Sequence, residues 1–192
     1  YRDSLFKQQK GRYIILSATF CQTKRDHLFK THYGDIRALL QEKGWAISEE
    51  NIQRGLSHIV ANTHLMGRWQ LLGENPKTIC DTAHNAHGFA EIFVQLGQEK
   101  YNTLHMVLGF VKEKDLDAIL PMFPKEAHYY FCTPKIDRGL SATLLQEKAA
   151  SYGLRGDAFP SVESALAQAQ EQAHTDDFIY IGGSTFVVAE VV

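Results

Sequence analysis

The sequence predicts an α/β domain built on a mostly parallel sheet of about six strands with helices on both faces. From Met66 onward, short β-rich apolar runs alternate with runs of helical periodicity, a pattern typical of βαβ units. The segment Leu104–Phe110 is almost continuously apolar, as expected of a strand that is covered on both faces. Hydrophobic residues make up 44% of the 192 residues, so a substantial core can form.

Each element is predicted from its own local pattern, and the chain shows neither internal repeats nor low-complexity tracts. Runs rich in β-branched and aromatic residues predict strands over Arg12–Phe20, Arg68–Leu72, Lys77–Cys80, Leu104–Phe110, Ala127–Cys132, a short stretch at Phe159, and Asp177–Ile181. Helical spacing and cap residues predict helices over Asp35–Lys43 ending at Gly44, Glu49–Val60 capped by Ser48, Phe89–Lys100, Asp115–Phe123, a segment from the Ser141 cap to Tyr152, and Val162–Ala173 capped by Ser161.

The change of pattern near Met66 divides the chain. We expect Ala61–Leu65 to be a linker, residues 1–65 to be one part, and residues 66–192 to be an α/β domain. The sequence opens at Tyr1 rather than at a methionine, which suggests that the chain is cut from a longer protein.

Composition argues against several classes of protein. A formal net charge of −2 and the lack of a basic, aromatic-interleaved patch argue against nucleic acid or an anionic membrane as a partner. No apolar run approaches the ~20 residues needed to span a bilayer, and no signal peptide opens the chain. The three cysteines, Cys21, Cys80 and Cys132, form no CxxC and indicate reduced, mostly buried thiols of a cytoplasmic protein.

The stretch Ile79–Gly88 is the strongest candidate for a functional site. It predicts a strand, a short turn and a helix, and in open α/β sheets ligands bind at such turns. Asp81 would lie at the strand tip and accept hydrogen bonds from ligand hydroxyls, while His84 would donate to a carboxylate or phosphate. The residues alone favour a plainer alternative, in which Asp81 caps the following helix and His84 lies on the surface. A metal site at Asp81, His84 and His87 is a third option, which no HxxxH or HExxH spacing supports.

Three other segments could contribute to such a site. Arg68 could contact a phosphate through two N–H groups, although a surface ion pair is the more common role of an arginine. Two glycines in Gly182-Gly183-Ser184 would let backbone approach a ligand, and Ser184 could bind it, cap the next helix, or do both. Lys112–Asp115 either starts a solvated helix or provides a lysine to a phosphate. No GxxxxGK[ST] phosphate-binding loop is present in the sequence.

Four motifs together resemble the C-terminal part of folylpolyglutamate synthase, a family of the Mur ligase superfamily that often also has dihydrofolate synthase activity. The motifs are Met66-Gly67-Arg68-Trp69, Asp81-Thr82-Ala83-His84-Asn85, Val107-Leu108-Gly109-Phe110 with Lys114-Asp115, and Ile181-Gly182-Gly183-Ser184. They occur in the family's order and spacing, and the resemblance covers about residues 35–192. It implies a Rossmann-like Mur ligase C-terminal domain.

The resemblance implies an ATP-dependent amide ligase that joins glutamate to the γ-carboxyl of folate, or to dihydropteroate, through an acyl phosphate. Arg68 matches an arginine that contacts ATP phosphates, and Asp81 matches an acid that contacts the nucleotide. His84 and Ser184 match residues of the ligase step, through the incoming glutamate. In the family, Mg²⁺ and most of the folate are bound by an N-terminal domain, so we expect this chain to be inactive by itself.

The resemblance also makes residues 1–65 the end of that N-terminal ATPase domain plus the linker. A strand over Arg12–Phe20 would then lack its sheet neighbours, and we expect it to pair with a second copy of the chain or to be poorly ordered. Two alternatives stay open. One is a nucleotide-binding α/β domain without a reaction of its own, and the other is a Mur-type ligase for cell-wall peptides, which usually carries a proline where this chain has Ala86.

Overall fold

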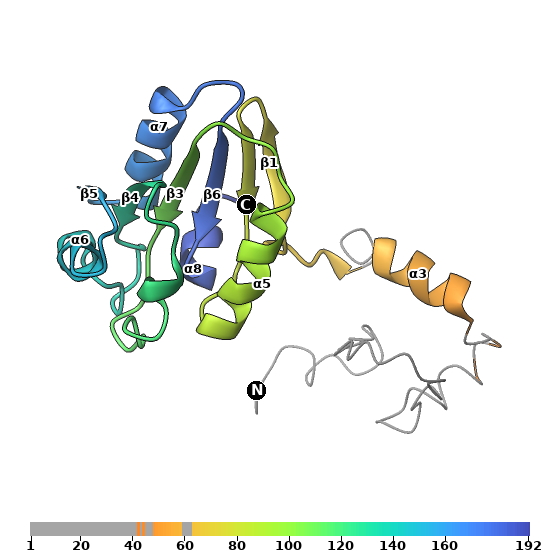
Figure 1. Cartoon of the computed structure of the whole chain (residues 1–192). Helices are drawn as coiled ribbons and strands as arrows, with labels where there is room; N and C mark the ends of the chain where they lie inside the picture. The colour runs from red at the N-terminus through yellow and green to blue at the C-terminus, as the bar shows by residue number, and fades with distance from the viewer. Residues whose placement is uncertain (1–41, 43, 45–47, 59–62) are drawn as a thin grey trace. The chain divides into compact units, whose positions relative to one another are not determined.

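The computed structural model describes residues 42, 44, 48–58 and 63–192 (Figure 1). By its internal contacts the chain divides into two units, Tyr1–Leu65 and Met66–Val192. In the first unit, helix α3 covers Glu49–Ser57 and ends before the Val60 expected from the sequence. The predicted strand over Arg12–Phe20 lies outside the described residues, as does the helix over Asp35–Lys43 apart from Glu42.

The second unit contains one sheet of six strands in the order β1-β2-β6-β3-β4-β5. The antiparallel pair β1–β2 lies at one edge, and every other pair is parallel, so the predicted mostly parallel sheet is confirmed. The strands are β1 (Gln70–Glu74), β2 (Lys77–Cys80), β3 (Leu104–Leu108), β4 (His128–Cys132), β5 (Gly156–Phe159) and β6 (Phe178–Gly182).

Helices cover both faces of this sheet, as predicted (Figure 1). On one face, α5 (Ala86–Leu96) and α6 (Ala142–Ala150) bury their apolar stripes with the rings of β4 and β6. On the other face, α7 (Val162–Gln172) and α8 (Thr185–Val188) pack against the remaining strand side chains. All residues of β3 and β6 are buried, because these central strands are covered from both sides.

Cap residues decide where the helices begin. Asn85 Oδ1 accepts a hydrogen bond from Gly88 N, so α5 starts at Ala86, three residues before the predicted start at Phe89. Ser161 and Ser164 form a reciprocal capping box at α7, which confirms the predicted cap. At α6, Ser141 occupies the predicted N-cap position but its side chain makes no capping bond, and Thr133 Oγ1 accepts from Ala142 N instead.

Two predicted elements differ from the structure. The helix expected over Asp115–Phe123 is reduced to a single 3₁₀ turn, Leu120–Met122. Pro121 lacks an N–H and its ring would clash with a preceding helical turn, so it fits only at the start of a helix. The strand expected over Arg68–Leu72 lies instead at Gln70–Glu74, because Trp69 has a φ of +44° and the chain bends before Gln70.

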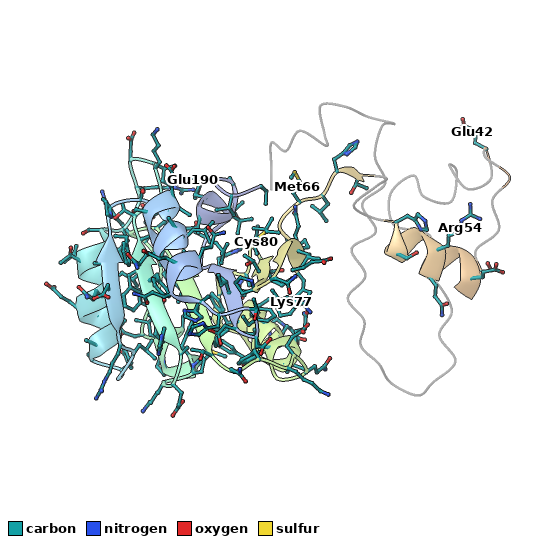
Figure 2. The ribbon with its side chains drawn as sticks, turned by 90° about the horizontal axis from the view of Figure 1, so that it is seen from above. Glu42, Arg54, Met66, Lys77, Cys80 and Glu190 are labelled. Atoms are coloured by element: carbon teal, nitrogen blue, oxygen red, sulfur yellow. The ribbon has the colours of Figure 1, made fainter. Side chains whose placement is uncertain are left out.

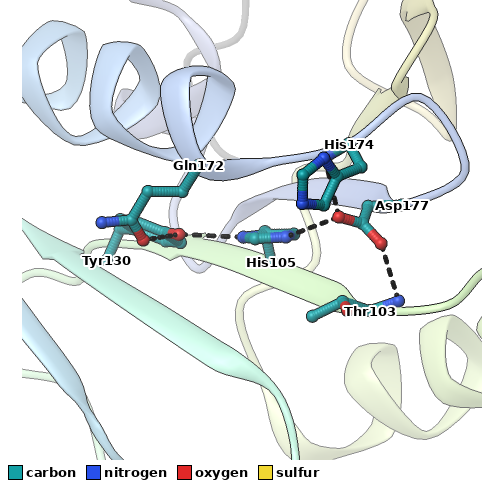
Figure 3. Close-up of polar contacts among 6 residues, drawn as sticks. All are labelled: Thr103, His105, Tyr130, Gln172, His174 and Asp177. Carbon is teal, nitrogen blue, oxygen red and sulfur yellow. Dashed lines mark hydrogen bonds and ion pairs between the residues drawn. The ribbon is translucent and has the colours of Figure 1, made fainter.

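A buried polar network joins β3, β4, α7 and the start of β6 (Figure 3). His105 Nδ1 lies 2.8 Å from the Tyr130 hydroxyl, which donates to Gln172 Oε1, and His105 Nε2 lies 3.4 Å from Asp177 Oδ2. Asp177 also accepts from the backbone N–H groups of Thr103 and His174. The network therefore fixes the amino ends of neighbouring parallel strands.

Burial sets the charge state of His105. Burial lowers the pKa of His105, the hydrogen bond and charge of Asp177 act in the opposite direction, and the nearby His128 and His174 lower it further, with a net decrease. Burial would raise the pKa of Asp177, but the hydrogen bonds from His174, His105 and Thr103 outweigh it and lower that pKa. A neutral imidazole has one N–H, so His105 donates to only one of Tyr130 and Asp177.

This network predicts a pH-dependent stability. In the unfolded chain His105 takes up a proton near pH ~6.5, whereas in the folded chain its pKa is lower. As the pH falls from ~7.5 to ~5, the unfolded state gains this proton first, so the free energy of unfolding should fall, with a slope below ~1.4 kcal/mol per pH unit from this group. Urea unfolding at several pH values in this range measures how the free energy of unfolding changes with pH. His105→Gln should flatten the dependence, whereas His87→Gln, at an exposed position of α5, should leave it unchanged.

A second buried polar group has a different environment. The Tyr180 hydroxyl on β6 is fully buried and, within the described part of the chain, has no hydrogen-bond partner. Burial raises the pKa of Tyr180 well above its usual range, with smaller effects from Asp81 and Cys80. The hydroxyl has lost its hydrogen bonds to water without compensation, so it opposes folding.

Tyr180→Phe should therefore leave the free energy of unfolding unchanged or raise it by ~1–2 kcal/mol. Tyr129→Phe is the matched control, because Tyr129 is a similarly buried residue whose hydroxyl donates to the Pro124 carbonyl over 2.5 Å. That variant should lose ~1 kcal/mol, and urea unfolding of both proteins makes the comparison. A loss at Tyr180 as large as that at Tyr129 would contradict the assignment.

Candidate functional site

The candidate site lies at the carboxyl edge of the sheet, where β2 and β6 end side by side. Strand β2 runs from Lys77 to Cys80, both labelled in Figure 2, and pairs in parallel with β6. The pairing continues one residue further, because Asp81 N donates to Ile181 O over 3.0 Å. Asp81 and the turn at Gly182-Gly183-Ser184 therefore follow adjacent strands at one edge, where ligands of open α/β sheets bind.

Asp81 is buried, with 7% of its surface exposed, and its carboxylate is bound by backbone groups from two segments. Oδ1 accepts from Ala83 N and Oδ2 accepts from Trp69 N, each over 2.7 Å. The alternative in which Asp81 caps the following helix is wrong, because Asn85 is the N-cap of α5. Asp81 instead joins the turn after β2 to the segment before β1.

That segment, Gly67–Trp69, has an unusual backbone. Gly67 and Trp69 have φ values of +71° and +44°, which lie in the left-handed region. A Cβ at Gly67 would lie 2.6 Å from Val188 Cγ1, so the position requires glycine for space as well as for conformation. The loop is held by Thr82 N, which donates to Gly67 O over 2.9 Å, and by Gln70 Oε1, which accepts from Gly67 N.

Three of the four predicted site residues line one open pocket of ≈ 250 Å³. Arg68 comes from the loop before β1, Asp81 from the end of β2, and His84 from the turn before α5. The full lining consists of Arg68, Asp81, Thr82, Ala83, His84, Asn85, Gly88, Glu91, Ile92 and Gln95. Segments that precede and follow the β1–β2 hairpin thus meet around a single hollow.

Ser184, the fourth predicted residue, does not line this pocket. It is buried at the N-terminus of α8, where Oγ accepts from Phe186 N over 3.2 Å, so it has the cap role that the sequence allowed. It lies at the same sheet edge, after the strand that neighbours β2. Gly183 makes this turn possible, with a φ of +95° and a Cβ position only 2.6 Å from the Gly109 carbonyl oxygen.

Some charged side chains of the pocket already form hydrogen bonds within the protein, and others form none among the described residues. Asp81 is occupied by backbone donors, whereas Arg68 and Glu91 are exposed and, within the described part of the chain, form no hydrogen bond or ion pair through their side chains. His84 Nδ1 lies 3.0 Å from the Thr82 carbonyl oxygen, which only accepts, so Nδ1 carries the proton. Nε2 of a neutral ring is then an acceptor, and of a protonated ring a donor to an anion.

The contribution of α5 to one side of the pocket was not predicted from the sequence. Gly88, Glu91, Ile92 and Gln95 are spaced three, four and seven residues apart, which places them on one face of a helix. The spacing could have predicted this part of the pocket, because a helix face that begins next to Asn85 lies against the turn that follows β2. By contrast, Lys112 Nζ donates to the Asp137 carbonyl over 3.0 Å, and the Lys112–Asp115 segment does not line the pocket.

The cysteines near this edge are structural. Cys80 and Cys132 are free and buried, as predicted, while Cys21 lies outside the described residues. Burial, with a smaller effect of Asp81, raises the pKa of Cys80 to about 11, so its thiol stays protonated and is no nucleophile. The described residues contain no group of three or more His, Cys, Asp or Glu side chains that could hold a metal ion. None of their helices combines the length and apolar character needed to cross a membrane.

Comparison with known proteins identifies relatives of this fold and site. The chain is 33% identical over 147 residues to a probable bifunctional folylpolyglutamate synthase/dihydropteroate synthase of Haloferax volcanii, which covers 75% of this chain and 17% of that protein. It is 29% identical over 157 residues to the dihydrofolate synthase/folylpolyglutamate synthase of Escherichia coli, covering 81% of this chain and 35% of that one. The chain thus spans about a third or less of the length of these relatives.

A similar solved structure is the bifunctional folylpolyglutamate synthase/dihydrofolate synthase of Yersinia pestis complexed with AMPPNP and a Mn ion. The TM-score is 0.65 at 30% sequence identity, and the match covers 81% of this chain and 36% of that chain. The family described as "Mur ligase, glutamate ligase domain" matches residues 67–185, which include Arg68, Asp81, His84 and Ser184. The chain therefore belongs to the Mur ligase family, through its glutamate ligase domain.

Proposed function

We propose that this chain is the glutamate ligase domain of an ATP-dependent ligase that adds glutamate to folate, or to dihydropteroate, through an acyl phosphate. The observation that carries the proposal is the pocket that joins Arg68, Asp81 and His84 at the carboxyl edge of a sheet of this family. Relatives of the same architecture have been crystallised with AMPPNP, Mn and L-glutamate, and others with ADP.

In this proposal Arg68 and Asp81 form the nucleotide side of the site. The Arg68 guanidinium is exposed and uncommitted, so it is available to contact phosphate oxygens. Negative charge on those oxygens is redistributed during phosphoryl transfer, and a fixed cation stabilises it. His84 lines the same pocket as Arg68, and Ser184 lies at the end of the neighbouring strand. His84 Nε2 and the Ser184 hydroxyl form the side that positions glutamate. The Ser184 oxygen accepts from Phe186 N and keeps its own proton for donation.

These groups need not form a covalent intermediate with the protein. Holding an amine against an acyl phosphate converts a bimolecular step into an effectively unimolecular one, which provides much of the rate. Among the described residues, no group of three or more His, Cys, Asp or Glu side chains could hold a divalent cation. We place Mg²⁺, the ATP-binding loop and most of the folate site in an N-terminal domain, and residues 1–65 at the end of that domain with its linker. The buried, reduced Cys80 and Cys132 support a cytoplasmic location.

A cell-wall ligase of the same superfamily is the main competing function. The relatives named above favour folate, as does Ala86 at the position where cell-wall ligases usually carry proline. In the complete protein, ADP release that requires glutamate together with a folate or dihydropteroate supports the proposal. ADP release that requires a muramoyl peptide precursor would favour the competing function, and nucleotide binding without turnover on either substrate would favour a non-catalytic domain.

The nucleotide role of Arg68 predicts a measurable loss. Arg68→Ala should weaken binding of ADP to the 192-residue chain by ~10- to 100-fold, because a hydrogen bond to a charged group contributes ~1.5–3 kcal/mol. Arg68→Lys should recover part of the affinity, since lysine keeps the charge but cannot donate through a planar fork. Isothermal titration calorimetry with ADP measures both.

Arg155→Ala is the matched control for this experiment. Arg155 is exposed just before β5, at the amino edge of the sheet and away from the pocket, so its removal should leave ADP binding unchanged. Equal losses in the Arg68 and Arg155 variants would show that ADP responds only to net charge. Such a result would contradict the proposed contact.

A further inference from the structure

We infer that Glu91 of α5 is a specificity-determining residue of the pocket: its carboxylate repels the phosphates of the nucleotide and accepts a hydrogen bond from an uncharged N–H or O–H donor of the nucleoside. This inference rests on the proposed function for the nucleotide role of the pocket. It adds to the site a residue that lies outside the motifs on which the family resemblance depends.

The first argument is that the Glu91 side chain is available to a ligand. Glu91 is exposed and lines the pocket, and within the described residues its carboxylate forms no hydrogen bond or ion pair. Gln95, one turn further along the same helix face, also lines the pocket. An ionised carboxylate only accepts hydrogen bonds, so the ligand group that binds Glu91 must be a donor.

The second argument is that positive and negative groups are separated along the pocket. Helix α5 begins after its Asn85 cap at the carboxyl edge, and because β2, β6 and β3 are parallel, it runs from there toward the amino edge. Glu91 lies six residues beyond the cap, roughly 9 Å along the axis at about 1.5 Å per residue. Arg68, just before β1, lies at the carboxyl edge with the positive end of the helix dipole, whereas Glu91 lies further from that edge.

The third argument is that this separation orients an anionic nucleotide. Phosphate oxygens are attracted to Arg68 and repelled by Glu91, so they bind at the carboxyl edge. The Asp81 carboxylate accepts one backbone N–H at each oxygen, and its remaining lone pairs can also accept from a ligand. The nucleoside carries no charge, and it has donors in its ribose hydroxyls and in the amino group of its base. It is therefore the part of the nucleotide that fits the acidic end of the pocket.

Two ligands separate attraction of the nucleoside from repulsion of phosphate. In the 192-residue chain, Glu91→Gln keeps a neutral acceptor and should weaken ADP binding by about 3-fold, while Glu91→Ala removes the acceptor and should weaken it by about 10-fold. Pyrophosphate has no nucleoside, so both substitutions should leave its affinity unchanged or raise it, because a repulsive charge is removed. Isothermal titration calorimetry with ADP and with pyrophosphate measures these affinities.

Glu147→Gln and Glu147→Ala are the matched controls. Glu147 is exposed on α6, which covers the same face of the sheet as α5 but does not line the pocket, so neither affinity should change. Two analogues then identify the donor, since 2′-deoxy-ADP lacks one ribose hydroxyl and IDP lacks the amino group of the base. Glu91→Ala should have no effect on the analogue that lacks the donor, and a full effect on both analogues would assign the 3′-hydroxyl.

The possible outcomes distinguish this inference from the proposed function. If Glu91→Ala left ADP binding unchanged or strengthened it while Arg68→Ala weakened it, the inference alone would be overturned. Equal losses of ADP and pyrophosphate affinity in Glu91→Ala would also overturn it, because the effect would not depend on the nucleoside. An unmodified chain that binds no ADP would overturn the nucleotide role of the pocket, and the inference would fail with it.

Discussion

The Asp81 carboxylate, buried at the end of β2, is the point at which the fold and the candidate site depend on each other. It accepts N–H groups from the turn that leads into α5 and from the loop that leads into β1. Without an acceptor at this position, the backbone N–H groups of Ala83 and Trp69 would lose their partners. A buried N–H group that is left unpaired costs ~1–3 kcal/mol. The two segments that these bonds join contribute Arg68 and His84 to one pocket. The bonds that hold this edge of the sheet together thus lie within the candidate site.

The two edges of the sheet are built in opposite ways. At the amino edge, His105, Tyr130, Gln172 and Asp177 form a closed network in which each buried polar side chain has a partner (Figure 3). At the carboxyl edge, the exposed side chains of Arg68 and Glu91 make no such bonds within the described residues. Satisfied networks rigidify the strands they join, and uncommitted charges can bind a ligand without first breaking a bond. The amino edge of the sheet is therefore held by internal hydrogen bonds, whereas the carboxyl edge has charged side chains that are available to a ligand.

Local patterns in the sequence predicted most of the strands and helices, and the exceptions have identifiable causes. Apolar runs such as Leu104–Phe110 and alternating strand and helix signals predicted the parallel sheet correctly. The helix expected over Asp115–Phe123 failed because its spacing was helical but Pro121 cannot occupy a helix interior. The strand expected from Arg68 begins two residues later, at Gln70, because the backbone bends at Trp69. The Trp69 N–H donates to Asp81, twelve residues away, and no local pattern reports such a long-range hydrogen bond.

The sequence by itself determined the chemical character of the site: an arginine, an acid and a histidine next to strand ends, in an order that resembles a known ligase family. Spacing along the chain reports strand ends and helix faces, because those depend on neighbouring residues. Only the tertiary structure decided what each side chain does. It placed Ser184 in a cap rather than in the pocket, brought Glu91 and Gln95 to the wall, and bound Asp81 to backbone rather than leaving it free. The bond from Trp69 N to Asp81 joins residues twelve positions apart, so it depends on how the chain packs, which the spacing of residues along the sequence does not report.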